Sequence, residues 1–261
     1  MDRRLTAIFI VLFILFFTGT RFNLDGYETE YVLSAMNLYH GNGPALASGF
    51  EQCPGISDTT GDIPVFPRQN LLQSYLSLPF YAAGAIMFGE QATIPDREGY
   101  WKLPWGPMLT VAMLNPLLAA LTAVLVALIA LELGIQPPRH TQLAVLFGIT
   151  TMMWHYAGLG MEIVQTAVLT GAVWCALRYR FHGGIHRLVM ALILIVALPN
   201  CKKHSIVFVI PLAVYLIWSV SRRSPRTDSR LAIGVATASG LGLVIMLAGV
   251  IYRFHADPGL F

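Results

Sequence analysis

The sequence predicts an all-α protein: a polytopic bundle of about seven transmembrane helices, with a long first external loop that carries juxtamembrane helices. Hydrophobic residues make up 56% of the 261 residues and charged residues only 12%, whereas soluble domains carry about a quarter charged residues. Continuous apolar stretches occur along the chain, among them residues 117–133, 188–198 and 231–251. The first and the last of these are long enough to cross or nearly cross the ~30 Å of bilayer hydrocarbon. Their hydrophobicity does not alternate, which favours helices over strands.

The first span is predicted at residues 5–20. Arg3 and Arg4 precede it, so the positive-inside rule places the N-terminus in the cytoplasm and Asp25 outside. The alternative is a cleaved signal peptide, because the basic start and the apolar core fit one, although Thr18-Gly-Thr20 is a poor cleavage site. In both cases Asp25 ends outside.

The later spans follow from length and charge. Residues 143–177 would measure about 50 Å as one helix, which is too long for a single crossing. We expect this stretch to break at residues 155–162, which hold glycines and its only acid, Glu162, and residues 188–221 to break at 199–204. The basic segments 178–187 and 222–230 then mark cytoplasmic loops.

Counting the membrane crossings back from these cytoplasmic loops leaves one apolar segment without a crossing. Residues 89–106 and Asp25 both come out external, so residues 71–88 are predicted to form a juxtamembrane helix in the interface. Gln73, Ser77 and Tyr81 recur along it at helical spacing, a polar stripe that favours this placement. The single transmembrane module then divides into a first span (1–21), an external loop with surface helices at 28–40 and 71–88 (22–106), a helical bundle (107–251) and a tail that looks cut short (252–261).

Asp25 is the strongest functional candidate. It follows the first span and opens an amphipathic run that ends at residues 41–44. An acid just outside a bilayer, ahead of a surface helix, is placed to act on a substrate whose tail lies in lipid. The structural alternative is a capping box, because Asp25 is followed by Glu28 at the right spacing, and such a cap is worth ~1 kcal/mol. Glu162, the only acid of a split helix pair, is a functional candidate or a plain turn acid.

Short motifs carry a family resemblance. In order along the chain they are Asp25-Gly-Tyr-Glu28 ahead of Gly41-Asn-Gly-Pro44, Phe66-Pro-Arg68, Thr150-Thr-Met-Met-Trp-His-Tyr156 ahead of Glu162, and Tyr252-Arg-Phe254. This series resembles the GT-C glycosyltransferases, and most closely the bacterial branch similar to protein O-mannosyltransferases and lipid A aminoarabinose transferases. Members of that branch are commonly longer, so the resemblance covers their N-terminal transmembrane module. Where they usually show His-Pro-Pro or Lys-Pro, this chain has Pro67-Arg-Gln.

The resemblance implies a cell-envelope enzyme. It would move a sugar from a polyprenyl-phosphate donor to a hydroxyl of a protein, lipid or glycan acceptor on the external face, with inversion. Asp25 is the implied catalytic base, and Glu162 a second catalytic or acceptor-positioning acid. A cation must neutralise the departing phosphate, and the implied residue is Arg68, with Lys102 or Lys202 in reserve. The alternative is that Arg68 snorkels to the lipid headgroups. The implied substrate-binding residues are Glu28, Arg68, Lys102 and Lys202.

The sequence also bounds cofactors and partners. No phosphate loop, GxGxxG or HExxH is present, so no cofactor is assigned, and participation of a divalent metal is left open. The net charge of +3 needs no polyanionic partner, so nucleic acid is not expected. Cys53 and Cys201 could both face outward and form a bridge, although the count of cysteines is odd.

Two other function classes stay open. One is a non-catalytic or truncated assembly subunit that depends on a missing C-terminal half or a partner subunit. The other, less favoured, is a transporter subunit, which should place acids and broken helices at mid-membrane. The expected location is the bacterial inner membrane, with the active site external and membrane lipids around the bundle.

Overall fold

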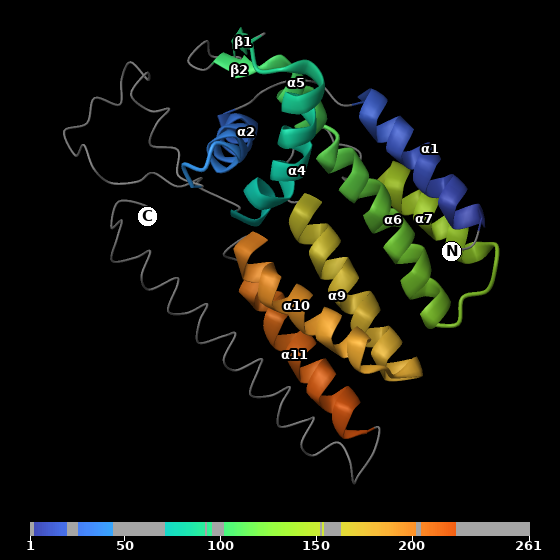
Figure 1. The fold of residues 1–261 in the computed structure, drawn as a ribbon. Helices are drawn as coiled ribbons and strands as arrows, with labels where there is room; N and C mark the ends of the chain where they lie inside the picture. Colours follow the sequence, from blue (N-terminus) through green and yellow to red (C-terminus); the bar gives the residue numbers. More distant parts are fainter. Residues whose placement is uncertain are drawn as a thin grey trace.

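The computed structural model describes residues 3–19, 26–43, 71–91, 93–95, 102–151, 153, 163–201 and 205–222. These residues are mainly helical, which confirms the all-α class, with one short β-ribbon that was not predicted (Figure 1). In chain order the elements are α1 (Arg3–Gly19), α2 (Gly26–Tyr39), α4 (Leu71–Phe88), β1 (Thr93–Pro95), β2 (Lys102–Pro104), α5 (Trp105–Val111), α6 (Leu114–Glu132), α7 (Arg139–Thr150), α9 (Ile163–His182), α10 (Ile185–Cys201) and α11 (Ile206–Ser221).

Helices α1, α6, α7, α9, α10 and α11 form a bundle in which consecutive helices run in opposite directions (Figure 1). Helix α6 packs against α1, α7 and α9, while α10 and α11 pack against α9 and each other. Buried alanines such as Ala119 and Ala123 on α6 and Ala172 on α9 line these contacts. Small side chains of this kind let helix backbones approach closely.

Two helices end in the same way. After α6, Gly134 adopts φ 86°, Gly134 N–H donates to the Leu131 carbonyl and Ile135 N–H donates to the Ala130 carbonyl. This pair of hydrogen bonds is a Schellman motif, which satisfies carbonyls that the end of a helix leaves unpaired. Gly41, at φ 78°, ends α2 with the equivalent bonds. The turns therefore follow directly from the positions of these glycines in the sequence.

The remaining elements gather at the end of the bundle where α1 ends and α9 begins. Helix α4 packs against α2, α5 and the nearby end of α10, and it is inclined to the bundle helices (Figure 1). The β-ribbon lies beside α2 and α5, with β1 and β2 antiparallel and Ile94 opposite Leu103. We call this assembly of α2, α4, α5 and the ribbon the end layer.

One helical segment of the described residues is long and apolar enough to cross a bilayer. It is Trp105–Glu132, 28 residues that comprise α5 and α6. The apolar helices Ile185–Cys201 and Val207–Ser221 are shorter. Residues 143–177 are divided between two helices, as predicted, since α7 ends at Thr150 and α9 begins at Ile163. The predicted position of the break, residues 155–162, lies outside the described residues.

Two predictions need correction. The polar stripe of α4 faces inward, with Gln73, Ser77 and Tyr81 all buried, because the polar groups of α5 and α6 lie on that side. The predicted basic loop 178–187 is a tight turn, since α9 runs to His182 and α10 begins at Ile185. Cys201 is a free, buried thiol near the Ala197 carbonyl, so the bridge to Cys53 that the sequence left possible is not formed; Cys53 itself lies outside the described residues.

Candidate functional site

The side chains predicted for catalysis and substrate binding lie outside the part of the chain that the structure describes. Four residues are outside it altogether: Asp25, Arg68, Glu162 and Lys202. Two are described in their backbone only, Glu28 in α2 and Lys102 in β2. The tail, residues 252–261, also lies outside. The geometry of the candidate site therefore comes from the neighbours of these positions.

Those neighbours are helix ends on one side of the molecule. Ile163, the first residue of α9, follows Glu162 in the sequence, and Cys201, the last residue of α10, precedes Lys202. The beginning of α9 and the end of α10 both lie toward the end layer, where α4 contacts α10 (Figure 1). Ile163 and Cys201, which adjoin the candidates Glu162 and Lys202 in the sequence, thus lie at the same end of the bundle.

The position at which α2 begins is relevant to the role of Asp25. The helix begins at Gly26, two residues earlier than predicted, so Asp25 directly precedes its first residue and Glu28 is its third. That spacing is the one a capping box requires. Capping and catalysis are compatible roles for this carboxylate, and they have to be separated by experiment.

A row of polar side chains follows the inner face of α4. Gln73, Ser74, Ser77 and Tyr81 are all almost completely buried. Among the described residues, the hydroxyls of Ser74 and Ser77 have no hydrogen-bond partner. A buried hydroxyl left without a partner costs ~1–3 kcal/mol. This face of α4 therefore offers polar groups that a ligand hydroxyl or a bound water would satisfy.

Neighbouring helices add to this buried polar cluster. Gln73 Nε2 donates to Asn115 Oδ1 of α6 at 3.4 Å, and Thr110 Oγ1 of α5 donates to the Phe80 carbonyl at 2.7 Å. Buried Ser34 and Asn37 come from α2, which packs against α4. Most buried polar side chains of the described residues thus belong to the end layer, although the surrounding segments are apolar.

A hydrogen-bonded group joins the ends of α2 and α4. Tyr81 Oη donates to Glu90 Oε1, and the same carboxylate oxygen lies 3.2 Å from His40 Nε2. Burial, and after it the hydrogen bond to Glu90, raises the pKa of the Tyr81 phenol well above its ordinary value, so the phenol stays protonated and acts as the donor. The Tyr39 ring packs against Tyr81 at 5.6 Å between centroids.

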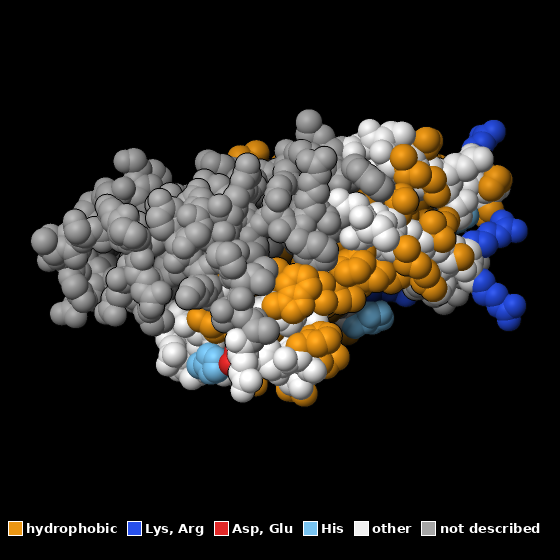
Figure 2. All heavy atoms as spheres, turned by 90° about the horizontal axis from the view of Figure 1, so that it is seen from above, with side chains coloured by type: hydrophobic (Ala, Val, Ile, Leu, Met, Phe, Trp, Pro, Cys, Tyr) orange, Lys and Arg blue, Asp and Glu red, His pale blue; other side chains and the backbone are white. Residues whose placement is uncertain are grey.

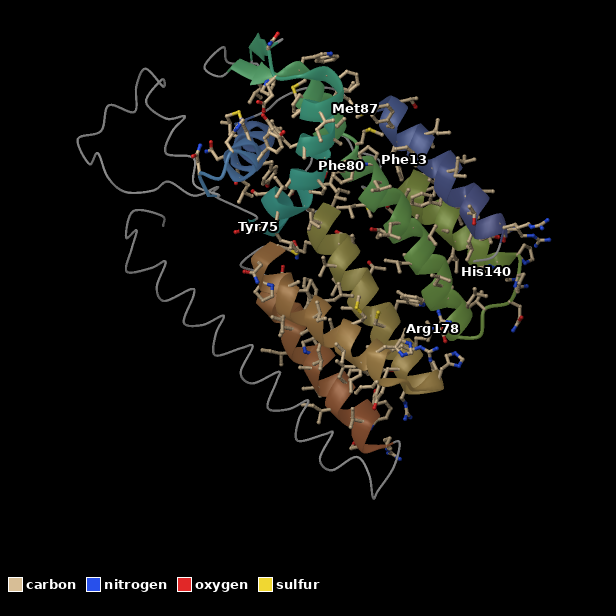
Figure 3. All side chains as sticks on the ribbon, viewed as in Figure 1. Phe13, Tyr75, Phe80, Met87, His140 and Arg178 are labelled. Atoms are coloured by element: carbon tan, nitrogen blue, oxygen red, sulfur yellow. The ribbon has the colours of Figure 1, made fainter. Side chains whose placement is uncertain are left out.

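The outward face of α4 is apolar. Tyr75, Ile86 and Met87 are all more than half exposed, at 51%, 79% and 61%. Figure 3 shows Tyr75 and Met87 near opposite ends of α4, so the apolar face runs along the whole helix. Helix α4 therefore has the reverse of the arrangement expected for a helix on a soluble protein.

Sequence reasoning missed part of this cluster. The polar stripe of α4 was evident but was assigned to the interface, and Thr110, Asn115 and the pair His40 and Glu90 were not predicted to belong to a site. The signal was the presence of polar residues within apolar segments, where burial without partners is costly. Among the described residues there is no group of three or more His, Cys, Asp or Glu side chains arranged to hold a metal ion.

Comparison with protein-family models, with curated proteins and with solved structures finds no match to this chain. The resemblance to the GT-C glycosyltransferases accordingly stays a hypothesis.

Proposed function

We propose that the chain is a multi-pass membrane glycosyltransferase of the GT-C kind. It transfers a sugar from a polyprenyl-phosphate donor to an acceptor hydroxyl on the external face of a bacterial inner membrane, with inversion. The observation that carries this proposal is the buried polar cluster of the end layer. It lies at the same end of the bundle as the helix ends that adjoin Asp25, Glu162 and Lys202 in the sequence, and the outward face of its helix α4 is apolar.

The distribution of arginines supports the membrane placement. Every arginine of the described residues lies at the end of the bundle opposite the end layer: Arg3, Arg4, Arg139, Arg178, Arg180, Arg187 and Arg222. On the face seen in Figure 2 the prominent basic side chains stand at one end, and Figure 3 shows Arg178 and His140 far from α4. By the positive-inside rule this end is cytoplasmic and the end layer is external.

External chemistry limits the donor. Nucleotide sugars are absent outside the cytoplasm, so the sugar arrives on a lipid phosphate. The acceptor oxygen attacks the anomeric carbon, the bond from that carbon to the phosphate oxygen breaks, and polyprenyl phosphate leaves with the bonding electrons. In this proposal Asp25 takes the hydroxyl proton, and Arg68 neutralises the departing phosphate, with Lys102 or Lys202 as the reserve cation.

The polar and apolar faces of α4 suit these two substrates. The buried hydroxyls and amides beneath it would bind sugar hydroxyls, and the apolar outer face would contact the polyprenyl tail or the surrounding lipid. Glu162 and Glu28 would position the acceptor. The same arrangement is compatible with a non-catalytic assembly subunit, so the base must be tested directly.

The test separates catalysis from capping at Asp25. Asn is about as good an N-cap as Asp, so Asp25→Asn should keep α2 folded but cannot accept a proton. We expect the rate of sugar transfer from a polyprenyl-phosphate donor to fall about 10²–10⁴-fold. Asp25→Ala should lose the same activity and also ~1 kcal/mol of stability. The assay uses the chain together with its partner subunit if activity requires one.

Transfer by the Asn variant at the parental rate would show that Asp25 is only a cap. If the parental protein itself transfers no sugar from any polyprenyl-phosphate donor, even in its native membrane, the assembly-subunit function is favoured instead.

A further inference from the structure

At the arginine-rich end, two guanidinium groups share one indole ring. The Arg180 Cζ atom of α9 lies 4.5 Å from the centroid of the Trp218 ring, and the Arg222 Cζ atom, just after α11, lies 5.8 Å from it. Cation–π contacts of this kind hold each guanidinium in place. They also bring two positive charges to the same indole ring, and a nearby anion would reduce the repulsion between these charges.

No acidic side chain supplies that anion among the described residues. Only two described side chains are acidic, and Glu90 belongs to the end layer at the opposite end. Glu132 is engaged elsewhere, with one oxygen 2.8 Å from His182 Nε2 and the other 3.6 Å from Arg178 Nε. Within the part of the chain that the structure describes, Arg180 and Arg222 therefore have no acidic partner.

An apolar track leads away from this pair along α11. Val207, Ile210 and Val214 are exposed at 67%, 59% and 60%, and they recur at helical spacing up to the half-exposed Trp218. The ring of Trp218 thus lies where an apolar surface meets a basic one. Tryptophan at such a boundary is typical of the interface between lipid headgroups and acyl chains.

We propose that Arg180, Trp218 and Arg222 form a binding site for one anionic phospholipid in the cytoplasmic leaflet. The phosphate would bind between the two guanidinium groups, the glycerol would pack on the indole edge, and an acyl chain would follow Val214, Ile210 and Val207. Guanidinium groups suit this role because they bind phosphate oxygens in a bidentate manner. The inference rests on the proposed membrane placement and is independent of sugar transfer.

The test measures lipid selectivity. The full chain is reconstituted in nanodiscs of phosphatidylcholine with a minor fraction of phosphatidylglycerol, and native mass spectrometry after detergent release gives the ratio of the two lipids retained. We expect phosphatidylglycerol to be enriched on the parent protein. Arg180→Gln and Arg222→Gln should each lower the enrichment roughly five-fold, the effect of about one basic residue near an anionic surface.

Arg139→Gln is the matched control, because Arg139 is exposed at the same end but belongs to α7. It should leave the enrichment unchanged. An equal loss in this variant would reduce the effect to general surface charge and overturn the site, as would equal retention of both lipids by the parent. Displacement of phosphatidylglycerol by inorganic phosphate alone would show that the pair binds a free anion and not a lipid. Each result is read from bound lipid, so a failure of the proposed transferase activity leaves it unaffected.

Discussion

Gly84 determines how closely α4 approaches α5. A Cβ atom at this position would lie 2.3 Å from Thr110 Oγ1, 2.5 Å from the Pro107 Cα and 2.7 Å from the Gly106 carbonyl oxygen. Two of these three atoms belong to the backbone, so no side-chain rotation relieves the clash. The close approach also lets the Thr110 hydroxyl bond to the Phe80 carbonyl across the two helices.

Gly84→Ala should therefore destabilise the end layer by about 1–3 kcal/mol, the usual cost of overpacking. The measurement is the free energy of unfolding during titration with a denaturing detergent, followed by circular dichroism. Gly171→Ala is the control, because its nearest contact is the flexible end of Leu194, 3.3 Å away. A loss at Gly84 no larger than at Gly171 would mean that α4 and α5 have room to separate.

At the scale of the element, α4 has its polar face inside and its apolar face outside. On a soluble protein this arrangement would be unfavourable, because it exposes apolar surface to water and buries polar groups. In contact with lipid it is favourable, because the exposed apolar face meets hydrocarbon and the polar face stays with the protein. The environment of α4 is therefore a testable property of the helix.

Nitroxide labels at Ile86→Cys and Gln91→Cys, with Cys53 replaced by Ser, compare two exposed positions that are close in sequence. We expect the label at position 86 to collide mainly with oxygen, which partitions into lipid. The label at position 91, beyond the helix, should collide mainly with a water-soluble nickel chelate. Electron paramagnetic resonance measures both collision rates. Preferential collision of the label at 86 with the nickel chelate would place this face of α4 in water.

For the whole molecule, the contact of His40 with Glu90 has a topological consequence. Their side chains lie 3.2 Å apart although α4 and a long segment separate them in the sequence. The residues just after α2 and just after α4 therefore lie on the same side of the molecule. This contact supports the prediction that α4 does not carry the chain across the bilayer.

Cysteine labelling in intact cells tests that topology, again with Cys53 replaced by Ser. Single cysteines at Asn42 and Gln91, which are both exposed and flank α4, should react with a membrane-impermeant maleimide from outside. A cysteine at Arg139, at the opposite end, should react only after permeabilisation. Labelling of Asn42 and Gln91 from opposite sides would show that the chain crosses the membrane between them.

Helix positions proved accessible from the sequence because they depend on local features. Long apolar runs, the glycine that follows α2, and the glycines and the acid expected to divide residues 143–177 each act over a few residues. The orientation of α4 was misjudged for the opposite reason. Its Gln73, Ser77 and Tyr81 are polar in any environment, and periodicity alone does not say whether such a stripe faces water or a polar interior.

By itself the sequence determined that the chain is helical and strongly apolar, and it located most of the helices. It also showed that basic residues recur at alternate helix ends. These features follow from hydrophobic run length and charge, which are local properties. Only the tertiary structure decided that Gln73 meets Asn115, that Tyr81 and His40 share Glu90, and that Arg180 and Arg222 share Trp218. These contacts join residues on different elements. Their geometry depends on how closely the helices pack. Close approaches such as the one at Gly84 control that packing distance, and no single segment of the sequence encodes it.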